Sequence, residues 1–251
     1  MKISIITVSF NSAQTIQDTI ESVLSQDYPS VEYIVVDGAS KDGTVDILKS
    51  YGDKIKWISE PDKGIYDAMN KGLKLATGEV IGIIGSDDFY PNNHVLSHIM
   101  QAFAEFGTDS VYGDKQYVDF HDKNKIVRYW QTGEYHKENW LNGWMIPHLA
   151  FYLKKSVYDK NGYYLTDFKC SGDYELMLRM LYKYQISTHY LPELVITMRT
   201  GGTSNASFKH RIRANKEDRR AWNINNLKPR WYTLWWKPLS KIGQLFKNSR
   251  N

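Results

Sequence analysis

The chain has 251 residues and a net charge of +4, with 42% hydrophobic and 24% charged residues. These proportions are typical of one large globular domain, and no apolar run approaches the roughly 20 residues that a membrane-spanning helix needs. A single cysteine excludes an internal disulfide and a cysteine-rich zinc site, and the first ten residues lack the cleavage site of a signal peptide, so we expect a cytoplasmic protein.

The first hundred residues alternate between strand-like and helix-like patterns with short connections, which is typical of a parallel sheet covered by helices. Short apolar runs predict strands at 3–8, 33–36, 56–59 and 80–84. Apolar residues at helical spacing predict three helices between these strands: one through Leu24 behind the N-cap Ser12, one behind the N-cap Thr44, and one at about 64–76.

Beyond residue 91 the pattern predicts a helix at 95–106, paired strands at 110–118 and 125–131, and a helix at 173–184. The sequence contains no internal repeat and no linker. We therefore expect an α/β fold with a mixed, mostly parallel sheet flanked by helices on both faces.

Polar side chains follow three of the predicted strands, at the edge of the sheet where ligands bind in open α/β folds. Thr7, Ser9 and Asn11 follow the first strand, Asp37 follows the second, and Asp87 with Asp88 follow the fourth. A single aspartate at such a place is commonly a helix cap or a turn former. Three polar strand ends at one edge favour a ligand-binding crevice.

Asp87 and Asp88 are adjacent carboxylates behind a buried strand and a Gly85-Ser86 turn. Their charges repel each other unless a cation offsets them, and Mg²⁺ or Mn²⁺ commonly takes one or two carboxylates and completes its shell with water and substrate phosphates. The pair therefore predicts a metal site that holds a diphosphate. The alternative is an Asp-Asp turn with no ligand.

The segments ISIITVSFN, VVDGASKDGT and SEPDKGIYDAMNKGLKLATGEVIGIIGSDD resemble the nucleotide-binding half of the inverting family 2 glycosyltransferases, which have the Rossmann-like GT-A fold. The later segments HLAFY and SGDYELMLRM resemble the acceptor half of the same family. The resemblance implies a catalytic domain at 1–205, divided into a nucleotide-sugar half at about 1–108 and an acceptor half at about 109–205, followed by a tail at 206–251.

The resemblance also implies roles for particular residues on the donor side. Thr7, Ser9, Asn11 and Asp37 would contact the nucleotide, and the metal-binding DXD element would be Gly85-Ser86-Asp87, in which glycine replaces the first acidic residue and Asp88 is a possible substitute for it. In the family, the segment that contains Lys63, Asp67 and Asn70 approaches the donor. The alternative is that these three are surface residues of a helix.

Asp173 resembles the catalytic base of the family, at the second position of a pair that reads Gly172-Asp173 here. A carboxylate at a helix N-terminus is kept ionised by the helix dipole, and Gly172 would leave room for a sugar hydroxyl; the alternative is that Asp173 is only an N-cap. His148 is a candidate for the acceptor side or a structural histidine. Arg199 begins a glycine-containing loop that could close over a diphosphate or form a plain turn.

Together these features predict a metal-dependent, inverting glycosyltransferase. It would move a hexose or N-acetylhexosamine from a nucleotide-diphosphate sugar, with UDP favoured, to an acceptor hydroxyl in polysaccharide, lipopolysaccharide or capsule assembly. A nicotinamide-dependent oxidoreductase and a P-loop nucleotidase are disfavoured because G-x-G-x-x-G and G-x-x-x-x-G-K-[ST] are absent. A non-catalytic adaptor that binds nucleotide sugars at a membrane is the alternative, and nucleic-acid binding would leave the acidic crevice unexplained.

Two further signals have ordinary structural interpretations. His94 and His98 are four residues apart on a predicted helix, but no third ligand accompanies them, so we expect surface residues. Cys170 lies close to Asp173 in the sequence without a paired histidine, so we expect it to pack rather than to act as a nucleophile.

The tail is basic and rich in tryptophan. Residues 219–251 contain eight lysines and arginines and no acidic residue, while the rest of the chain is mildly acidic. Apolar residues at 239, 242, 245 and 246 recur at helical spacing, which predicts an amphipathic helix. We expect this tail to dock on the anionic inner face of the cytoplasmic membrane, near a lipid-linked glycan acceptor; the alternative is that it packs on the catalytic domain or on a second subunit.

Overall fold

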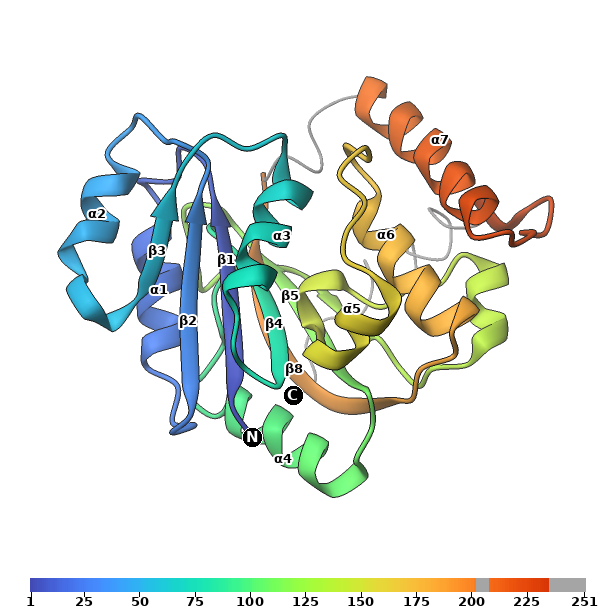
Figure 1. Ribbon diagram of the computed structural model, residues 1–251, viewed down its shortest axis with the longest axis horizontal. Coiled ribbons are helices and arrows are strands. Elements are labelled where there is room, and N and C mark those ends of the chain that lie inside the picture. Colours follow the sequence, from blue (N-terminus) through green and yellow to red (C-terminus); the bar gives the residue numbers. More distant parts are fainter. Residues whose placement is uncertain (202–207, 235–251) are drawn as a thin grey trace.

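The computed structural model describes residues 1–201 and 208–234. Its centre is an eight-stranded sheet in the order β3-β2-β1-β4-β7-β5-β6, with β8 paired to β5 (Figure 1). The strands are β1 (Ile3–Ser9), β2 (Val31–Asp37), β3 (Lys56–Ser59), β4 (Val80–Gly85), β5 (Ser110–Val118), β6 (Ile126–Trp130), β7 (Phe151–Lys154) and β8 (Thr188–Arg199). β3, β2, β1 and β4 are parallel neighbours, whereas β7 is antiparallel to both β4 and β5. The predicted mixed, mostly parallel sheet is therefore confirmed.

Helices cover both faces of the sheet. The described residues form seven α-helices: α1 (Ile16–Leu24), α2 (Thr44–Ser50), α3 (Ile65–Leu75), α4 (Val95–Phe106), α5 (Lys155–Asn161), α6 (Gly172–Met177) and α7 (Phe208–Ile224). Shorter helical turns lie at Gly52–Lys54, Lys137–Asn142 and His148–Ala150, and a π-helical turn at Leu178–Lys183 continues α6. The helix predicted at 173–184 is thus an α-helix followed directly by a π-helical turn.

Side-chain alternation along the central strands assigns the helices to their faces. In β1, Ile3 and Ile5 pack with α1, α2 and α4, whereas Ile6 and Val8 pack with α3, α5 and α6. Successive side chains of a strand point to opposite faces, so a strand such as β1, which is buried at every position, must be covered on both sides. The all-apolar strands read from the sequence are therefore the centre of the fold.

Two predicted helix caps are wrong. The N-cap of α1 is Thr15 rather than Ser12, although the Ser12 carbonyl accepts the amides that open the helix. The N-cap of α2 is Gly43, whose φ of 98° is in the left-handed region that glycine tolerates, and Thr44 is the first helical residue. The strands β7 and β8 and the helix α5 were not predicted, because their apolar runs are short or interrupted by polar residues.

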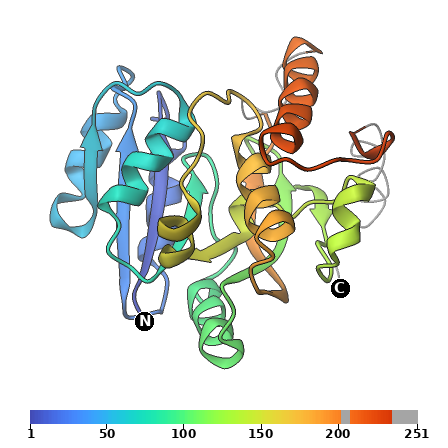
Figure 2. The same cartoon turned by 45° about the vertical axis from the view of Figure 1, so that its right-hand side comes forward.

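The C-terminal helix α7 lies beside α6 in both views of the fold (Figures 1 and 2). Ala221 and Trp222 of α7 and Leu234 beyond it belong to the same buried cluster as α3 and α6. The Trp222 indole N–H also donates a hydrogen bond of 2.9 Å to the hydroxyl of Tyr174. The described part of the predicted tail is therefore packed against the catalytic body, while the amphipathic helix predicted at 239–246 lies outside the described residues.

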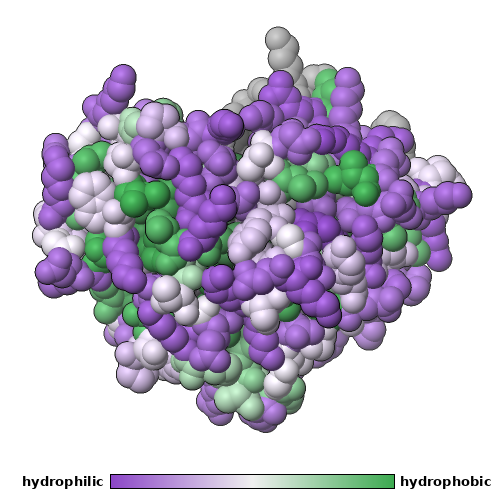
Figure 3. All heavy atoms as spheres, in the orientation of Figure 1, coloured by the Kyte–Doolittle hydropathy of each residue, from purple (hydrophilic) through white to green (hydrophobic). Residues whose placement is uncertain are grey.

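The described residues contain no helix that is both long and apolar enough to cross a membrane. On the face shown in Figure 3, hydrophilic side chains predominate and hydrophobic ones gather in a few patches.

Candidate active site

A cavity of about 530 Å³ opens at the edge of the sheet where β4, β5 and β8 end. The residues that line it come from strand ends, from α3, and from the segment that leads into α6. Five of the residues predicted from the sequence line this cavity: Asp87, Asp88, His148, Asp173 and Arg199. Both predicted acidic groups and the predicted acceptor-side histidine are therefore brought to one place.

The acid turn after β4 consists of Asp87 and Asp88. Asp88 is 2% exposed, and burial together with the neighbouring Asp87 raises the pKa of its carboxyl well above the usual range. Burial also raises the pKa of Asp87, which is half-buried. Among the described residues, the Asp88 Oδ1 atom is buried without a hydrogen-bond partner. A buried polar atom with no partner is costly, so this oxygen is available to a ligand.

Gly85 makes room for the carboxylates of the acid turn. A Cβ atom at Gly85 would lie 2.5 Å from Asp88 Oδ2 and 3.0 Å from Asp87 Oδ1. The missing side chain therefore makes the space that the Asp88 carboxylate occupies. Whether Asp88 substitutes for an acidic residue at position 85 stays a prediction.

The acid turn fits a divalent cation. The described residues contain no group of three or more histidine, cysteine or acidic side chains that could enclose a metal. Mg²⁺ and Mn²⁺ do not need such a cage when one or two carboxylates and the phosphates of a substrate complete the shell. Asp87 and Asp88, with the unpartnered Oδ1 atom, supply that carboxylate set.

Arg199 holds the acid turn from β8. Its guanidinium donates a hydrogen bond of 2.7 Å to the Asp87 carbonyl, forms an ion pair with Asp18, and lies over the ring of Phe89. These contacts occupy the group that we predicted to bind a diphosphate. Arg199 therefore positions the acid turn in this structure, and residues 202–204 of its predicted loop lie outside the described residues.

Asp173 is the second residue of α6 and faces the cavity next to Tyr66 of α3. The Tyr66 hydroxyl donates a hydrogen bond of 3.3 Å to Asp173 Oδ1. Burial and the charge of Asp173 raise the pKa of Tyr66 far above its usual value, so this hydroxyl remains a donor. The Asp173 carboxylate is thus held at the N-terminus of α6 by the hydroxyl of Tyr66.

Gly172 has a different role from the one predicted. It is buried, and a Cβ atom there would lie 2.8–2.9 Å from three atoms of the Tyr66 ring. The space beside Gly172 is therefore filled by Tyr66 and is not open to a sugar hydroxyl.

Glu217 of α7 fixes the segment that leads into α6. Its carboxylate accepts hydrogen bonds from the backbone amides of Lys169, Cys170 and Ser171 at 2.8–3.1 Å. The hydroxyl of Ser171 also donates to the carbonyl of Ala214, at 3.2 Å. Three amides that converge on one carboxylate make a charge-assisted clamp, which sequence reasoning missed because Glu217 is 44 residues beyond Asp173 in a segment taken for a tail.

His148 lies on the same wall of the cavity, between acidic and basic neighbours. Its Nε2 atom is 2.7 Å from the hydroxyl of Tyr164, and the side-chain amide of Asn70 holds the backbone of Tyr164 through two hydrogen bonds. Burial lowers the pKa of His148, against the charge of Asp173, which raises it. His148 is therefore neutral near pH 7, and Asn70 is placed to support it rather than to contact a donor directly.

The other predicted donor residues form a hydroxyl network at the ends of β1, β2 and β3. The carboxylate of Asp37 is fully buried and accepts hydrogen bonds from the hydroxyls of Ser9, Ser40 and Ser59. Thr7 is also buried and shares a hydrogen bond of 3.0 Å with the Tyr33 hydroxyl. A nucleotide contact by Thr7 or Asp37 would require these bonds to be exchanged, so their predicted role stays a prediction.

Four further predicted residues lie near the cavity without lining it. Asn11 is exposed and accepts the amide of Lys41, and Ser86 shares a hydrogen bond with Ser12. Asp67 accepts the backbone amide of Lys63 at 3.0 Å, which fastens the start of α3. Asp67 therefore acts as a local helix cap here.

The histidine and cysteine signals lie where the sequence interpretation places them. His94 and His98 are exposed, and they pair with different carboxylates, Asp27 and Glu193. Cys170 lines the cavity, and burial raises the pKa of its thiol, which keeps it protonated.

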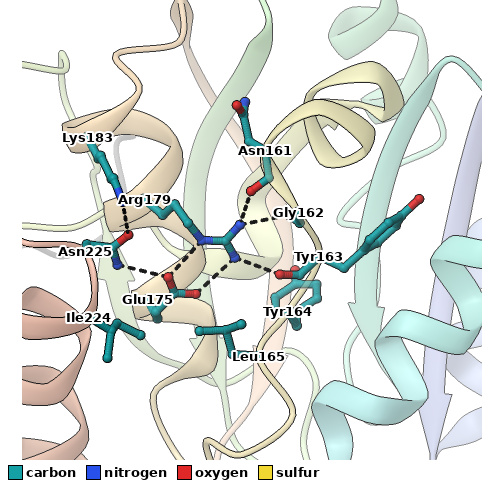
Figure 4. Close-up of a pocket in the computed structure, with 10 residues that line it drawn as sticks. All are labelled: Asn161, Gly162, Tyr163, Tyr164, Leu165, Glu175, Arg179, Lys183, Ile224 and Asn225. Atoms are coloured by element: carbon teal, nitrogen blue, oxygen red, sulfur yellow. Dashed lines mark hydrogen bonds and ion pairs between the residues drawn. The ribbon is translucent and has the colours of Figure 1, made fainter.

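A second cavity, of about 390 Å³, lies between the π-helical turn and the segment after α5 (Figure 4). Arg179 fills it with an ion pair of 2.8 Å to the buried Glu175 and with hydrogen bonds to the carbonyls of residues 161–163. Asn225, the residue after the end of α7, donates a further bond to Glu175. These polar groups satisfy one another, so this cavity is a structural joint and not a reaction site.

Comparisons with known proteins show the family to which the chain belongs. Residues 4–159 match the family model described as "Glycosyl transferase family 2". The chain belongs to this glycosyltransferase family. An uncharacterized glycosyltransferase of Mycobacterium tuberculosis is 31% identical over 189 residues, which cover 70% of this chain and 68% of the relative.

Solved glycosyltransferase structures share the fold at low sequence identity. TarS 1–349 of S. aureus, in complex with UDP-GlcNAc, has a TM-score of 0.69 and 18% identity, over 90% of this chain and 65% of that chain. The mannosyltransferase PcManGT of Pyrobaculum calidifontis, in complex with GDP-Man and Mn²⁺, has a TM-score of 0.64 and 19% identity, over 99% of this chain and 76% of that chain. The GT-A fold expected from the sequence is thereby confirmed.

Proposed function

We propose that this glycosyltransferase transfers one sugar from a nucleoside diphosphate donor to an acceptor hydroxyl by a single displacement. The observation that carries the proposal is the acid turn, whose buried Asp88 oxygen has no partner among the described residues, in one cavity with Asp173. The acid turn offers a site for the metal-bound diphosphate, and Asp173 offers a base. Donor and acceptor can thus be held on opposite sides of one anomeric carbon.

Asp173 accepts the proton of the acceptor hydroxyl while the acceptor oxygen forms a bond to the anomeric carbon. The bond from that carbon to the diphosphate oxygen breaks, and the nucleoside diphosphate leaves with the electron pair. One base and attack from the side opposite the leaving group give inversion. A divalent cation bound by Asp87 and Asp88 would offset the negative charge of the departing diphosphate.

The donor that we propose is a UDP-hexose or UDP-N-acetylhexosamine. Support comes from the fold shared with TarS, whose structure contains UDP-GlcNAc, while PcManGT with GDP-Man makes GDP-sugars the second candidate. The acceptor that we propose is a growing glycan of the cell surface. A relative of Mycobacterium bovis, 27% identical over 80% of this chain and 78% of its own length, is named a PGL/p-HBAD biosynthesis glycosyltransferase, which supports a biosynthetic role.

The test is incubation of the protein with UDP-GlcNAc, UDP-glucose, UDP-galactose or GDP-mannose, with Mn²⁺, Mg²⁺ or EDTA, while release of the nucleoside diphosphate is measured. We expect metal-dependent release from one donor, and its loss in Asp173→Asn. Binding of a donor without release, in the presence of metal and of lipid and glycan acceptors, would favour the alternative of a non-catalytic nucleotide-sugar adaptor.

Docking on the cytoplasmic face of the membrane is a further part of the proposal. Its support is the basic and aromatic composition of residues 228–251 and the side chain of Trp231, which is 87% exposed at the end of the described chain. Tryptophan favours the membrane interface, and basic residues favour anionic lipids. Sedimentation with anionic liposomes would compare the full chain with a chain that ends after Asn226. Equal pelleting of the two would reject docking through the tail.

A further inference from the structure

Lys115 of β5 is a buried cation in the wall of the active-site cavity. Lys115 as a whole is 7% exposed, and its Nζ atom lies 3.4 Å from the Met198 sulfur. The same atom is 4.5 Å from the ring centre of Trp130 and 4.7 Å from that of Tyr117. Sequence reasoning missed this group because the alternation of β5 alone does not show which face its residues share with the acid turn.

No carboxylate within the described residues forms an ion pair with Lys115. A thioether is a weak acceptor, and ring faces attract a cation without replacing the solvation that it loses on burial. The other two basic side chains that are buried to this degree are paired differently: Arg179 with Glu175, and Arg199 with Asp18. Among the three buried basic side chains of the described residues, Lys115 is therefore the one that has no ion pair and could pair with a bound anion.

The charge of Lys115 influences Asp88 of the acid turn and His148. It opposes the rise in the Asp88 pKa that burial and Asp87 produce, and it adds to the lowering of the His148 pKa by burial. Lys115 thus lies close to both groups, and all three line the same cavity. The anion that the acid turn and its cation bring to this place is a diphosphate.

We propose that Lys115 binds an oxyanion of the nucleoside diphosphate, as a second cationic contact beside the metal held by the acid turn. The inference rests on the proposed function and adds a residue to its donor site. The ammonium would offset the negative charge on the phosphate oxygens of the donor and of the departing nucleoside diphosphate. The rings of Tyr117 and Trp130 keep this ammonium in place before the donor binds.

The test compares the affinities of the unsubstituted protein, Lys115→Met and Lys115→Arg for UDP, GDP and the two nucleosides, with and without Mn²⁺. Methionine keeps the length of the side chain and suits its apolar surroundings. For the diphosphate that binds the unsubstituted protein, we expect Lys115→Met to lower the affinity by about tenfold or more, the change expected when a charged contact is lost. Lys115→Arg should restore part of this affinity. Nucleoside affinity should be unchanged.

Lys74→Met is the matched control, because it removes the same charge from an exposed position on α3. Thermal unfolding provides a second readout. A buried charge kept for function costs stability, so Lys115→Met should unfold at the same temperature as the unsubstituted protein or higher. If Lys115→Met does not fold, Lys115→Gln serves as the neutral variant in the same binding measurement.

Unchanged diphosphate affinity in a folded neutral variant would overturn the inference. This holds even if the KM of that variant for the acceptor rises. Equal weakening by the Lys74→Met control would overturn it as well, because the effect would then be one of net charge. Failure of the unsubstituted protein to bind either diphosphate would overturn the proposed function itself, and the inference with it.

Discussion

The carboxylate of Glu217 accepts a hydrogen bond of 2.9 Å from the backbone amide of Ser171, two residues before the proposed catalytic base. Glu217 belongs to α7, so the C-terminal helix determines how the segment before α6 enters the active site. We therefore expect α7 to support the proposed base through Glu217, although the family model ends at residue 159.

Glu217→Gln should lower kcat by about tenfold or more while leaving the affinity for the donor unchanged. An amide accepts fewer of the three converging N–H groups, and a hydrogen bond to a charged group is worth about 1.5–3 kcal/mol. The measurement is kcat and donor affinity beside Glu105→Gln, an exposed control on α4. A loss of donor affinity equal to the loss of kcat would show that Glu217 supports the whole cavity and not the base alone.

Gly172→Ala should lower both stability and turnover, because its Cβ atom would lie 2.8 Å from the Tyr66 ring. Overpacking of this kind costs about 1–3 kcal/mol. Thermal unfolding and turnover of Gly172→Ala, Tyr66→Ala and the double variant would check the cause. The double variant should recover stability relative to the sum of the two single losses. Strict additivity would show that the two residues do not compete for the same space.

Asp88→Asn should abolish the metal dependence of donor binding, since the substitution removes one of the two carboxylates at the acid turn. Excess EDTA should have the same effect on the unsubstituted protein. Calorimetric titration of Mn²⁺ and UDP into Asp88→Asn, Asp87→Asn and the unsubstituted protein provides the measurement. Full turnover in EDTA, or Mn²⁺ binding that ignores both substitutions, would refute the metal site.

His148 should make the fold less stable in mild acid. Burial lowers its pKa in the folded state, so the unfolded chain binds the proton first as the pH falls below about 6.5, the ordinary histidine value. The resulting loss of unfolding free energy is absent above that pH and grows below it until the pH reaches the pKa of His148 in the folded state. His148→Gln, which keeps a partner for Tyr164, should therefore flatten the decline in unfolding free energy between about pH 6.5 and 5. Parallel curves for the two proteins would contradict this.

The sequence was sufficient for the central strands and the acid turn because each is a local signal. Runs such as Val80–Gly85 must be buried on both faces, and the polar residues that follow them reach the same edge of a parallel sheet. Asp87 and Asp173 were found in this way or by family resemblance.

The missed residues depend on contacts between distant segments. Lys115 enters the cavity only because β5 pairs with β7 and β8, and β8 was not predicted. Glu217 meets the amides of 169–171 only because α7 packs on α6. The role of Gly172 was misjudged for the same reason, since nothing local indicates that Tyr66, 106 residues earlier, fills the space beside it.

The most direct test of the central claim is the turnover of Asp173→Asn at saturating donor, measured with donor affinity on the same protein. The account predicts unchanged donor affinity and a kcat lower by roughly 10²–10⁴, the usual contribution of a positioned base. Unchanged kcat at saturation together with a loss of donor affinity would contradict it, because Asp173 would then belong to the nucleotide site and the base would be another residue.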